Sequence, residues 1–182
     1  MRIDYLFRHS HYLPTLAEWM YREWFHPVGL TREQAANQLH QRLQADALPL
    51  ALVAFADEPL GMVCLLADVP PDGHEPIACL AGLYVAPAQR RQGVGGRLCQ
   101  RALVEARRLG HSKLYLYTPN RAAFYAHLGW VKIVETLVEA GDFHEISTFM
   151  EYVVAPGVAS HDSLPESQLG SLAKLAETRP SR

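Results

Sequence analysis

The sequence predicts an α/β (α+β) domain in which a central sheet of about seven strands is flanked by about four helices. Two kinds of segment alternate along the chain and support this fold class. Short runs such as 50–55 and 77–85 are apolar, as buried strands are, whereas 94–109 repeats apolar residues at helical spacing. The chain has 182 residues, of which 49% are hydrophobic. A chain of this length can form one domain with a sizeable core, and its hydrophobic content is too high for a disordered chain.

The first half of the domain is expected to combine two helices with three strands. The expected elements are a strand at 3–7, helices at 13–25 and 31–45, and strands at 50–55 and 60–66. The second helix has the clearest start, because Thr31 and Gln34 have the spacing of a capping box. The segment 68–76 contains three prolines and one glycine, so it is expected to be irregular.

The second half is expected to hold the remaining four strands and two helices. The expected elements are strands at 77–85, 113–117, 130–138 and 143–153, and helices at 94–109 and around Tyr125. Gly110 is well placed to end the first of these helices, and Gly141-Asp142 to join the last two strands. Beyond 155 the chain becomes polar. The domain is therefore expected to span 1–155, and 156–182 to be a tail with a short helix at 165–177.

The segment 83–96 predicts an anion-binding site. An apolar strand runs into a proline-marked turn, and a basic, glycine-rich bend then opens a helix. Small residues let the backbone approach a phosphate, and the first N–H groups of a helix have no partner within it. Arg90 and Arg91 add positive charge there. A nucleotide P-loop would continue with Lys and Ser/Thr after Gly96, and a dinucleotide fingerprint would have glycine in place of Leu98, so neither motif fits.

Two motifs together resemble the GNAT superfamily of acyl-CoA N-acyltransferases. The pattern Arg90-x-x-Gly93-x-Gly95 is similar to its pyrophosphate-binding loop. The later pattern, in which Asn120 precedes Phe124-Tyr125-x-x-Leu-Gly-Trp, is similar to the segment that closes its cofactor groove. The resemblance implies a mixed, mostly antiparallel sheet with a splayed cofactor groove, and acetyl-CoA as co-substrate. Asn120 stands two residues closer to Phe124 than in many members, so the helix that follows is expected to have a short first turn.

The resemblance also implies which residues contact acetyl-CoA. Backbone N–H groups of the strand before the loop, most of all that of Val85, would hold the thioester carbonyl. The residues expected to bind the cofactor are Leu83, Tyr84, Val85, Arg90, Arg91, Gln92, Gly93, Val94, Gly95, Gly96, Asn120 and Tyr125.

Tyr125 is the candidate catalytic residue, as the general acid that protonates the departing thiolate. An ordinary core tyrosine is the alternative, since apolar residues flank it. The expected reaction is direct attack of a primary amine on acetyl-CoA in a ternary complex. The other interpretation is a non-catalytic acyl-CoA-binding regulator of a partner protein. No single general base stands out among the acids and histidines expected near the substrate, which are Glu18, Glu23, Asp68, His74, Glu75 and His144.

The acceptor is left open between a small-molecule amine and a peptide N-terminus. Trp24, Asp68 and His144 are the residues expected to bind it, because the resemblance implies that their segments shape the acceptor site. A homodimer is consistent with the family, some of whose members pair their late strands across a dimer axis.

Charge, hydropathy and cysteine content argue against a nucleic-acid-binding, secreted, membrane or metal-binding protein. The formal net charge of −2 gives no global field for nucleic acid, and no aromatic platform accompanies the arginines of 90–108. The chain lacks a signal-peptide core and a run of membrane-spanning length. Its three widely spaced cysteines fit reduced thiols in the cytoplasm. The pair His9 and His11 is too small for a metal site, so no metal is expected.

Overall fold

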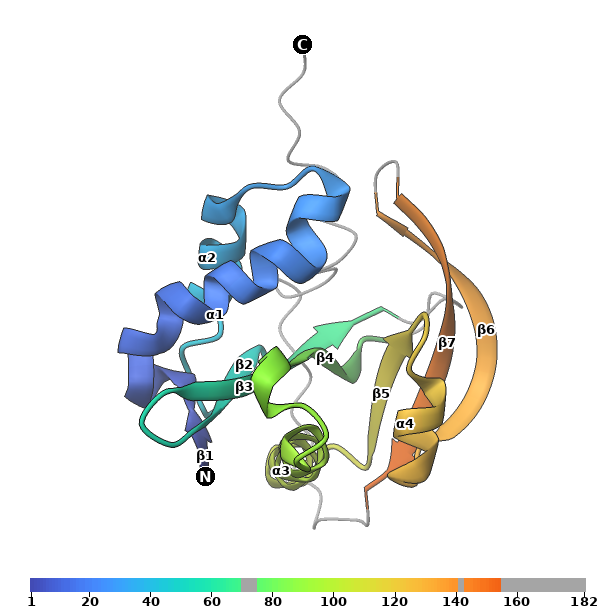
Figure 1. Ribbon diagram of the computed structural model, residues 1–182. Coiled ribbons are helices and arrows are strands. Elements are labelled where there is room, and N and C mark those ends of the chain that lie inside the picture. The colour runs from blue at the N-terminus through green and yellow to red at the C-terminus, as the bar shows by residue number, and fades with distance from the viewer. Residues whose placement is uncertain (70–74, 141–142, 155–182) are drawn as a thin grey trace.

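A seven-stranded sheet with helices on both faces forms the fold (Figure 1). The computed structural model describes residues 1–69, 75–140 and 143–154. The expected tail at 156–182, with its helix at 165–177, lies outside the described residues. The strand order is β1-β2-β3-β4-β5-β7-β6, and only β4 and β5 pair in parallel.

The bounds agree closely with the expected elements in the second half of the chain. The strands are β1 (Arg2–Tyr5), β2 (Leu50–Phe55), β3 (Pro59–Asp68), β4 (Ile77–Val85), β5 (Lys113–Thr118), β6 (Val131–Ala140) and β7 (Phe143–Val153). The helices are α1 (Leu13–Met20), α2 (Arg32–His40), α3 (Val94–Arg108) and α4 (Ala122–His127). Shorter turns of 3₁₀-helix lie at Leu6–Tyr12, His26–Val28 and Pro87–Gln89, and a π-helical turn continues α1 over Tyr21–Phe25.

Two expected bounds in the first half are wrong. The strand predicted at 3–7 ends at Tyr5, because the chain turns into a 3₁₀-helix at Leu6. The helix predicted to run to 45 begins as expected, with both hydrogen bonds of the Thr31–Gln34 capping box, but ends at His40. It stops there because the chain turns, and the Arg42 carbonyl accepts a hydrogen bond from the Ala51 N–H of β2 at 3.1 Å in place of one from a further helical turn.

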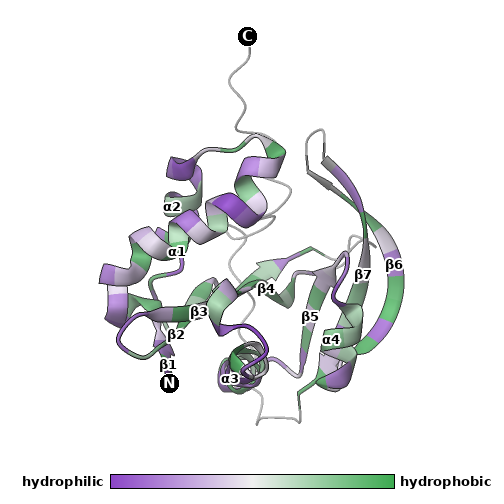
Figure 2. Cartoon of the chain, viewed as in Figure 1, coloured by the Kyte–Doolittle hydropathy of each residue, from purple (hydrophilic) through white to green (hydrophobic). Residues whose placement is uncertain are grey.

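The sheet separates two apolar cores. One lies beneath α3 and α4 and contains Leu98, Tyr125 and Trp130 together with residues of β2–β5 and β7. The other lies beneath α1 and α2 and contains Leu16 and Leu39 together with residues of β2 and β3. Figure 2 shows the matching pattern of hydropathy, with apolar central strands and a strongly hydrophilic segment leading into α3. The three cysteines are free and buried, Cys99 in the first core and Cys64 in the second.

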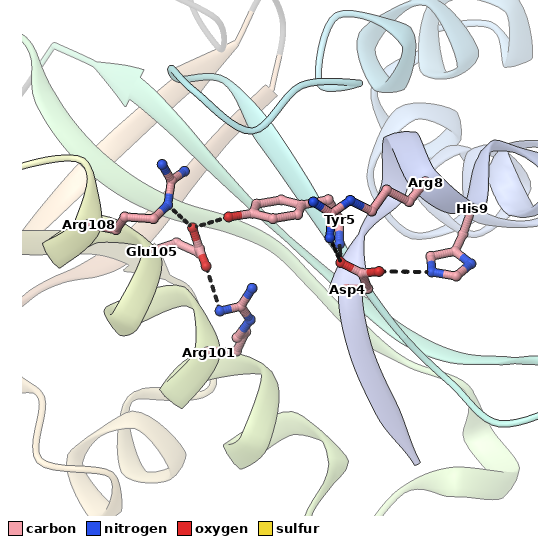
Figure 3. A network of polar contacts seen from close by, with 7 residues as sticks. All are labelled: Asp4, Tyr5, Arg8, His9, Arg101, Glu105 and Arg108. Atoms are coloured by element: carbon pink, nitrogen blue, oxygen red, sulfur yellow. Dashed lines mark hydrogen bonds and ion pairs between the residues drawn. The ribbon is translucent and has the colours of Figure 1, made fainter.

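A buried polar network joins the first strand to the longest helix (Figure 3). The Tyr5 hydroxyl donates to the Glu105 carboxylate at 2.6 Å, and Glu105 is 1% exposed. Arg101 and Arg108 form ion pairs with the same carboxylate at 2.5 and 2.7 Å. Burial and the bond to Glu105 raise the pKa of Tyr5. The network therefore fixes α3 against the edge of the sheet and thereby positions the loop at its N-terminus.

Candidate active site

The centre of the candidate site is the place where β4 and β5 separate. These parallel neighbours, both described throughout, pair only at Cys79 and Tyr115, and they diverge in Figure 1. β4 also carries a bulge, because Gly82 and Leu83 together stand opposite one residue of β3. Gly82 has a φ of +56° there, which glycine adopts readily. Residues 81–85 are half-buried beside the gap, in contrast to the buried 78–80.

The loop after β4 has the geometry that the sequence predicts for an anion site. It turns through Pro87–Gln89, and Arg91 and Gly93 then adopt positive φ angles of 61° and 79°. The Arg97 N–H donates to the Gly93 carbonyl at 3.1 Å, so the N–H groups of residues 94–96 precede the first bond of the helix. A Cβ added to Gly93 would meet no heavy atom within 4 Å. A ligand can thus approach the backbone at this point.

Side chains of the loop brace it from within. The Arg90 Nε donates to the Val85 carbonyl at 3.0 Å, and the Gln92 Nε2 donates to the Ala88 carbonyl at the same distance. Arg90, Arg91 and Gln92 are all exposed. The loop is held to the end of β4 by one arginine, while positive charge stays at the surface where a pyrophosphate would bind.

Contacts between α3 and α4 bring the two sequence motifs together. A Cβ added to Gly95 would lie 3.4 Å from Phe124 Cζ, and one added to Gly96 would lie 3.6 Å from Leu128. Small residues on α3 are therefore what allow α4 to pack against the loop.

Tyr125 lies on α4, 8% exposed, between Phe124 and Trp130. Burial, with a smaller effect from Cys99, raises the pKa of Tyr125, so its hydroxyl keeps its proton at neutral pH. Burial also raises the pKa of the Cys99 thiol to about 12, which leaves that thiol a poor nucleophile.

The start of α4 depends on a residue that sequence reasoning missed. The buried Thr118 hydroxyl accepts a hydrogen bond from the Arg121 N–H at 3.1 Å and so holds the turn that leads into the helix. Asn120, which the motif suggests as a cofactor contact, is exposed. A threonine shortly before a predicted helix is a known local bonding signal and could have been recognised.

The three residues expected to bind the acceptor are not brought together. Trp24 makes an edge contact with Tyr84 of β4, with ring centroids 6.3 Å apart, and so lies beside the gap. Asp68 pairs with Ile77 at the opposite end of β4, six residues from Leu83, which is roughly 20 Å along a strand. His144 is exposed near the start of β7.

Asp68 is nonetheless an unusual carboxyl group. It is 8% exposed, and burial raises its pKa to about 6 although the Val69 N–H donates to it at 2.9 Å.

Other candidates from the sequence have structural roles. Glu18 accepts hydrogen bonds from Arg22 at 2.6 Å and Arg32 at 2.9 Å, which lowers its pKa. His9 lies 3.2 Å from the Asp4 carboxylate and packs on Phe55. Within 1–69, 75–140 and 143–154, no three metal-ligating side chains gather at one point, and no helix has the length and apolarity needed to cross a membrane.

Comparison with known proteins identifies the family. The profile of the Acetyltransferase (GNAT) family matches residues 13–130, well over half of the chain. The chain therefore belongs to the GNAT acetyltransferase family. This confirms the fold class and the class of enzyme predicted from the two motifs.

Solved structures show the same fold. An aminoglycoside 6'-N-acetyltransferase complexed with coenzyme A superposes with a TM-score of 0.67 at 15% identity, covering 87% of this chain and 100% of that one. The ribosomal-protein-S18-alanine N-acetyltransferase from Escherichia coli gives 0.61 at 19%, covering 88% and 98%. A putative acetyltransferase from Salmonella typhimurium, solved with acetyl-CoA, gives 0.61 at 16% with the same coverage. No curated protein sequence matches the chain significantly.

Proposed function

We propose that this chain transfers the acetyl group of acetyl-CoA to a primary amine by direct attack in a ternary complex. The observation that carries the proposal is the gap between β4 and β5. The expected anion-binding loop lies at one side of this gap, and Tyr125 packs in the core beneath these strands. Acetyl-CoA would supply an activated thioester and a thiolate leaving group.

The residues present fit acetyl-CoA. The N–H groups of residues 94–96, with Arg90 and Arg91, would hold the pyrophosphate, and the open space beside Gly93 admits it. The half-buried backbone of 83–85 would line the pantetheine arm, with the Val85 N–H as the expected donor to the thioester carbonyl. A preorganised donor of this kind contributes about 2.7–4 kcal/mol to transition-state stabilisation in a well-measured enzyme.

Tyr125 would act as the general acid. A tyrosine of ordinary pKa, about 10, is already protonated at neutral pH, and burial raises the pKa of Tyr125 further, so that a proton is present as the carbon–sulfur bond breaks. Because a phenol of high pKa is a weak acid, the proton would be transferred during departure of the thiolate and not before it.

The acceptor amine would approach from the face that carries Trp24. Among proteins of this fold, one acts on aminoglycosides and another on the alanine of a ribosomal protein, so both small amines and peptide N-termini belong in the test. Asn120, Asp68 and His144 remain predictions as cofactor or acceptor contacts.

The test is release of CoA thiol from acetyl-CoA with a panel of amines and short peptides, for the wild type and Tyr125→Phe. We expect turnover to fall about 10²-fold in the variant, within the range for loss of a general acid, while the Kd for acetyl-CoA changes little. Tyr152→Phe is the matched control, since Tyr152 is half-buried and also packs on Trp130.

Equal turnover in wild type and Tyr125→Phe would remove Tyr125 from the mechanism. Tight binding of acetyl-CoA without turnover of any acceptor would instead favour the non-catalytic acyl-CoA-binding regulator.

A further inference from the structure

Two groups of aromatic side chains lie on the face of the sheet opposite α3. Leu114 and Leu116 of β5 point into the core beneath α3. Because side chains alternate along a strand, Tyr115 and Tyr117 belong to the opposite face. Phe149 of β7 stacks on both rings, with centroids 5.4 and 4.7 Å apart and interplanar angles of 11° and 23°. Phe149 itself is 6% exposed, so the half-buried Tyr115 and Tyr117 are the rings that this half of the sheet presents on this side, with Phe149 supporting them from below.

The second group comes from the other side of the gap between β4 and β5. Tyr84 of β4 packs against Trp19 of α1, with centroids 5.0 Å apart, and makes the edge contact with Trp24. Trp24 is carried by the π-helical turn Tyr21–Phe25, a rare conformation often found at functional sites. All three rings are half-buried and so keep part of their surface accessible.

The backbone expected to hold the thioester lies between the two aromatic groups. Tyr84 is the direct neighbour of Leu83 and Val85, and Tyr115 stands opposite Cys79 at the single β4–β5 pair. In Figure 1, α1 and α2 lie over the β1–β4 half of the sheet, and no described helix covers the β5–β7 half on this face. An acceptor approaching the gap from here would meet aromatic rings on both sides.

The charges nearby favour a ligand with a single positive charge. Glu18 is already paired with Arg22 and Arg32, and Glu151, which stands opposite Tyr115, accepts from Lys113 at 2.9 Å. Glu23, exposed next to Trp24, is the carboxylate nearest these rings along the chain and can take one ammonium group, whereas Glu145, on the same side of β7, lies four residues from Phe149. A polyamine or aminoglycoside carries several ammonium groups, which need several carboxylates when desolvated. Aromatic faces suit one ammonium group and an apolar body.

We propose that the acceptor is a primary monoamine with an aromatic carbon skeleton, bound between Trp19, Trp24 and Tyr84 on one side and Tyr115 and Tyr117 on the other. The inference rests on the proposed acetyl transfer and names its substrate class. In the proposed reaction the amine nitrogen bonds to the acetyl carbonyl carbon and the carbon–sulfur bond breaks. The amine loses a proton, and the CoA thiolate takes one up to become the thiol.

The experiment compares kcat/KM for phenethylamine, propylamine, spermidine, kanamycin and an alanine-terminated tetrapeptide. We expect phenethylamine to exceed each of the others by at least tenfold. Trp24→Leu and Tyr117→Leu should raise the KM for phenethylamine at least fivefold and leave the Kd for acetyl-CoA unchanged. Phe7→Leu is the control, because Phe7 is an exposed aromatic residue that packs on Tyr5 at the β1 edge.

Binding is measured in parallel by quenching of tryptophan fluorescence as phenethylamine is added in the presence of CoA. Saturable quenching that Trp24→Leu weakens at least fivefold supports the inference even where turnover is slow. Preferred turnover of kanamycin, spermidine or the peptide would overturn this inference and leave acetyl transfer standing. No turnover of any acceptor would contradict acetyl transfer itself, and absence of quenching would then overturn the aromatic site as well.

Discussion

At the scale of single residues, burial decides what each titratable group can do. Tyr125 and Asp68 are both 8% exposed, and burial raises both pKa values. For Tyr125 this preserves the neutral, proton-donating form that a general acid requires. For Asp68 it moves the ionisation of a carboxyl group close to physiological pH, which makes the charge of this residue sensitive to its surroundings.

Asp68 should make the stability of the fold depend on pH. Its pKa rises from 3.8 to about 6 on folding, so the folded state binds the proton more tightly. The stability from this group is present below about pH 4 and is lost as the pH rises through 6. We expect Asp68→Asn, which keeps an oxygen for the Val69 N–H, to be more stable than wild type by about 1 kcal/mol at pH 4.5 and about 3 kcal/mol at pH 7.5.

Urea unfolding at the two pH values measures this difference, and Asp57→Asn in the exposed β2–β3 turn provides the control. A gain that does not change with pH would show that the Asp68 carboxyl ionises normally in the folded protein.

At the scale of elements, close backbone approach positions the end of β4, the strand proposed to hold the thioester. Gly61 of β3 faces the end of β4, and a Cβ there would lie 2.6 Å from the Tyr84 carbonyl oxygen and 3.2 Å from Leu98. The absence of a side chain at this point lets β3, β4 and α3 meet immediately before the anion-binding loop.

Gly61→Ala should therefore disturb both stability and cofactor binding. The added methyl must displace backbone, and overpacking of this kind costs about 1–3 kcal/mol. We expect the Tm to fall and the affinity for acetyl-CoA to decrease, because Tyr84 and Val85 must shift. Gly96→Ala is the comparison for stability, since its Cβ would meet Leu128 at an ordinary 3.6 Å within a helix. A Gly61→Ala variant as stable as Gly96→Ala would argue against the close contact.

At the scale of the whole molecule, the Glu105 network joins the N-terminal strand to the middle of the chain. It links Tyr5 of β1 to α3, which are about 100 residues apart in sequence. We expect Glu105→Gln to lower the free energy of unfolding by about 2–3 kcal/mol. This loss is somewhat smaller than that from breaking a fully buried ion pair, because Arg101 and Arg108 stay partly exposed.

Thermal unfolding measures this effect, with Glu58→Gln in an exposed turn as control. Tyr5→Phe removes only the hydroxyl and should lose about 1 kcal/mol. Equal stability of Glu105→Gln and Glu58→Gln would show that the network contributes packing alone.

The outer edge of the sheet, strand β6, provides a surface through which two copies of the chain could associate. β6 is an edge strand of ten residues, and Val131, Ile133, Val134 and Leu137 are 46–61% exposed. Long apolar edges favour pairing with another strand, and we propose that two copies associate through β6.

Light scattering after size-exclusion chromatography should give twice the chain mass of 20.4 kDa. Ile133→Lys should yield monomers, whereas Val104→Lys on the exposed side of α3 should not. A monomeric wild type would exclude this assembly.

The sequence by itself determined the features that depend on neighbouring residues. The Thr31–Gln34 capping box, the bounds of β4 and α3, and the turn at Gly93 all follow from hydrogen bonds and spacings within a few residues. The family followed too, because both motifs are local. Local signals were weaker where a distant partner decides the local structure, as after His40, where the Arg42 carbonyl accepts a hydrogen bond from β2.

Only the tertiary structure decided which distant residues meet. The contact of Gly95 with Phe124, the Tyr5–Glu105 bond and the two aromatic groups each join segments that no local pattern relates. It also showed that the Thr118 hydroxyl bonds the backbone at the entrance to α4. The physical reason is the same in each case: periodicity fixes which face a side chain occupies, but packing across the sheet selects its partners.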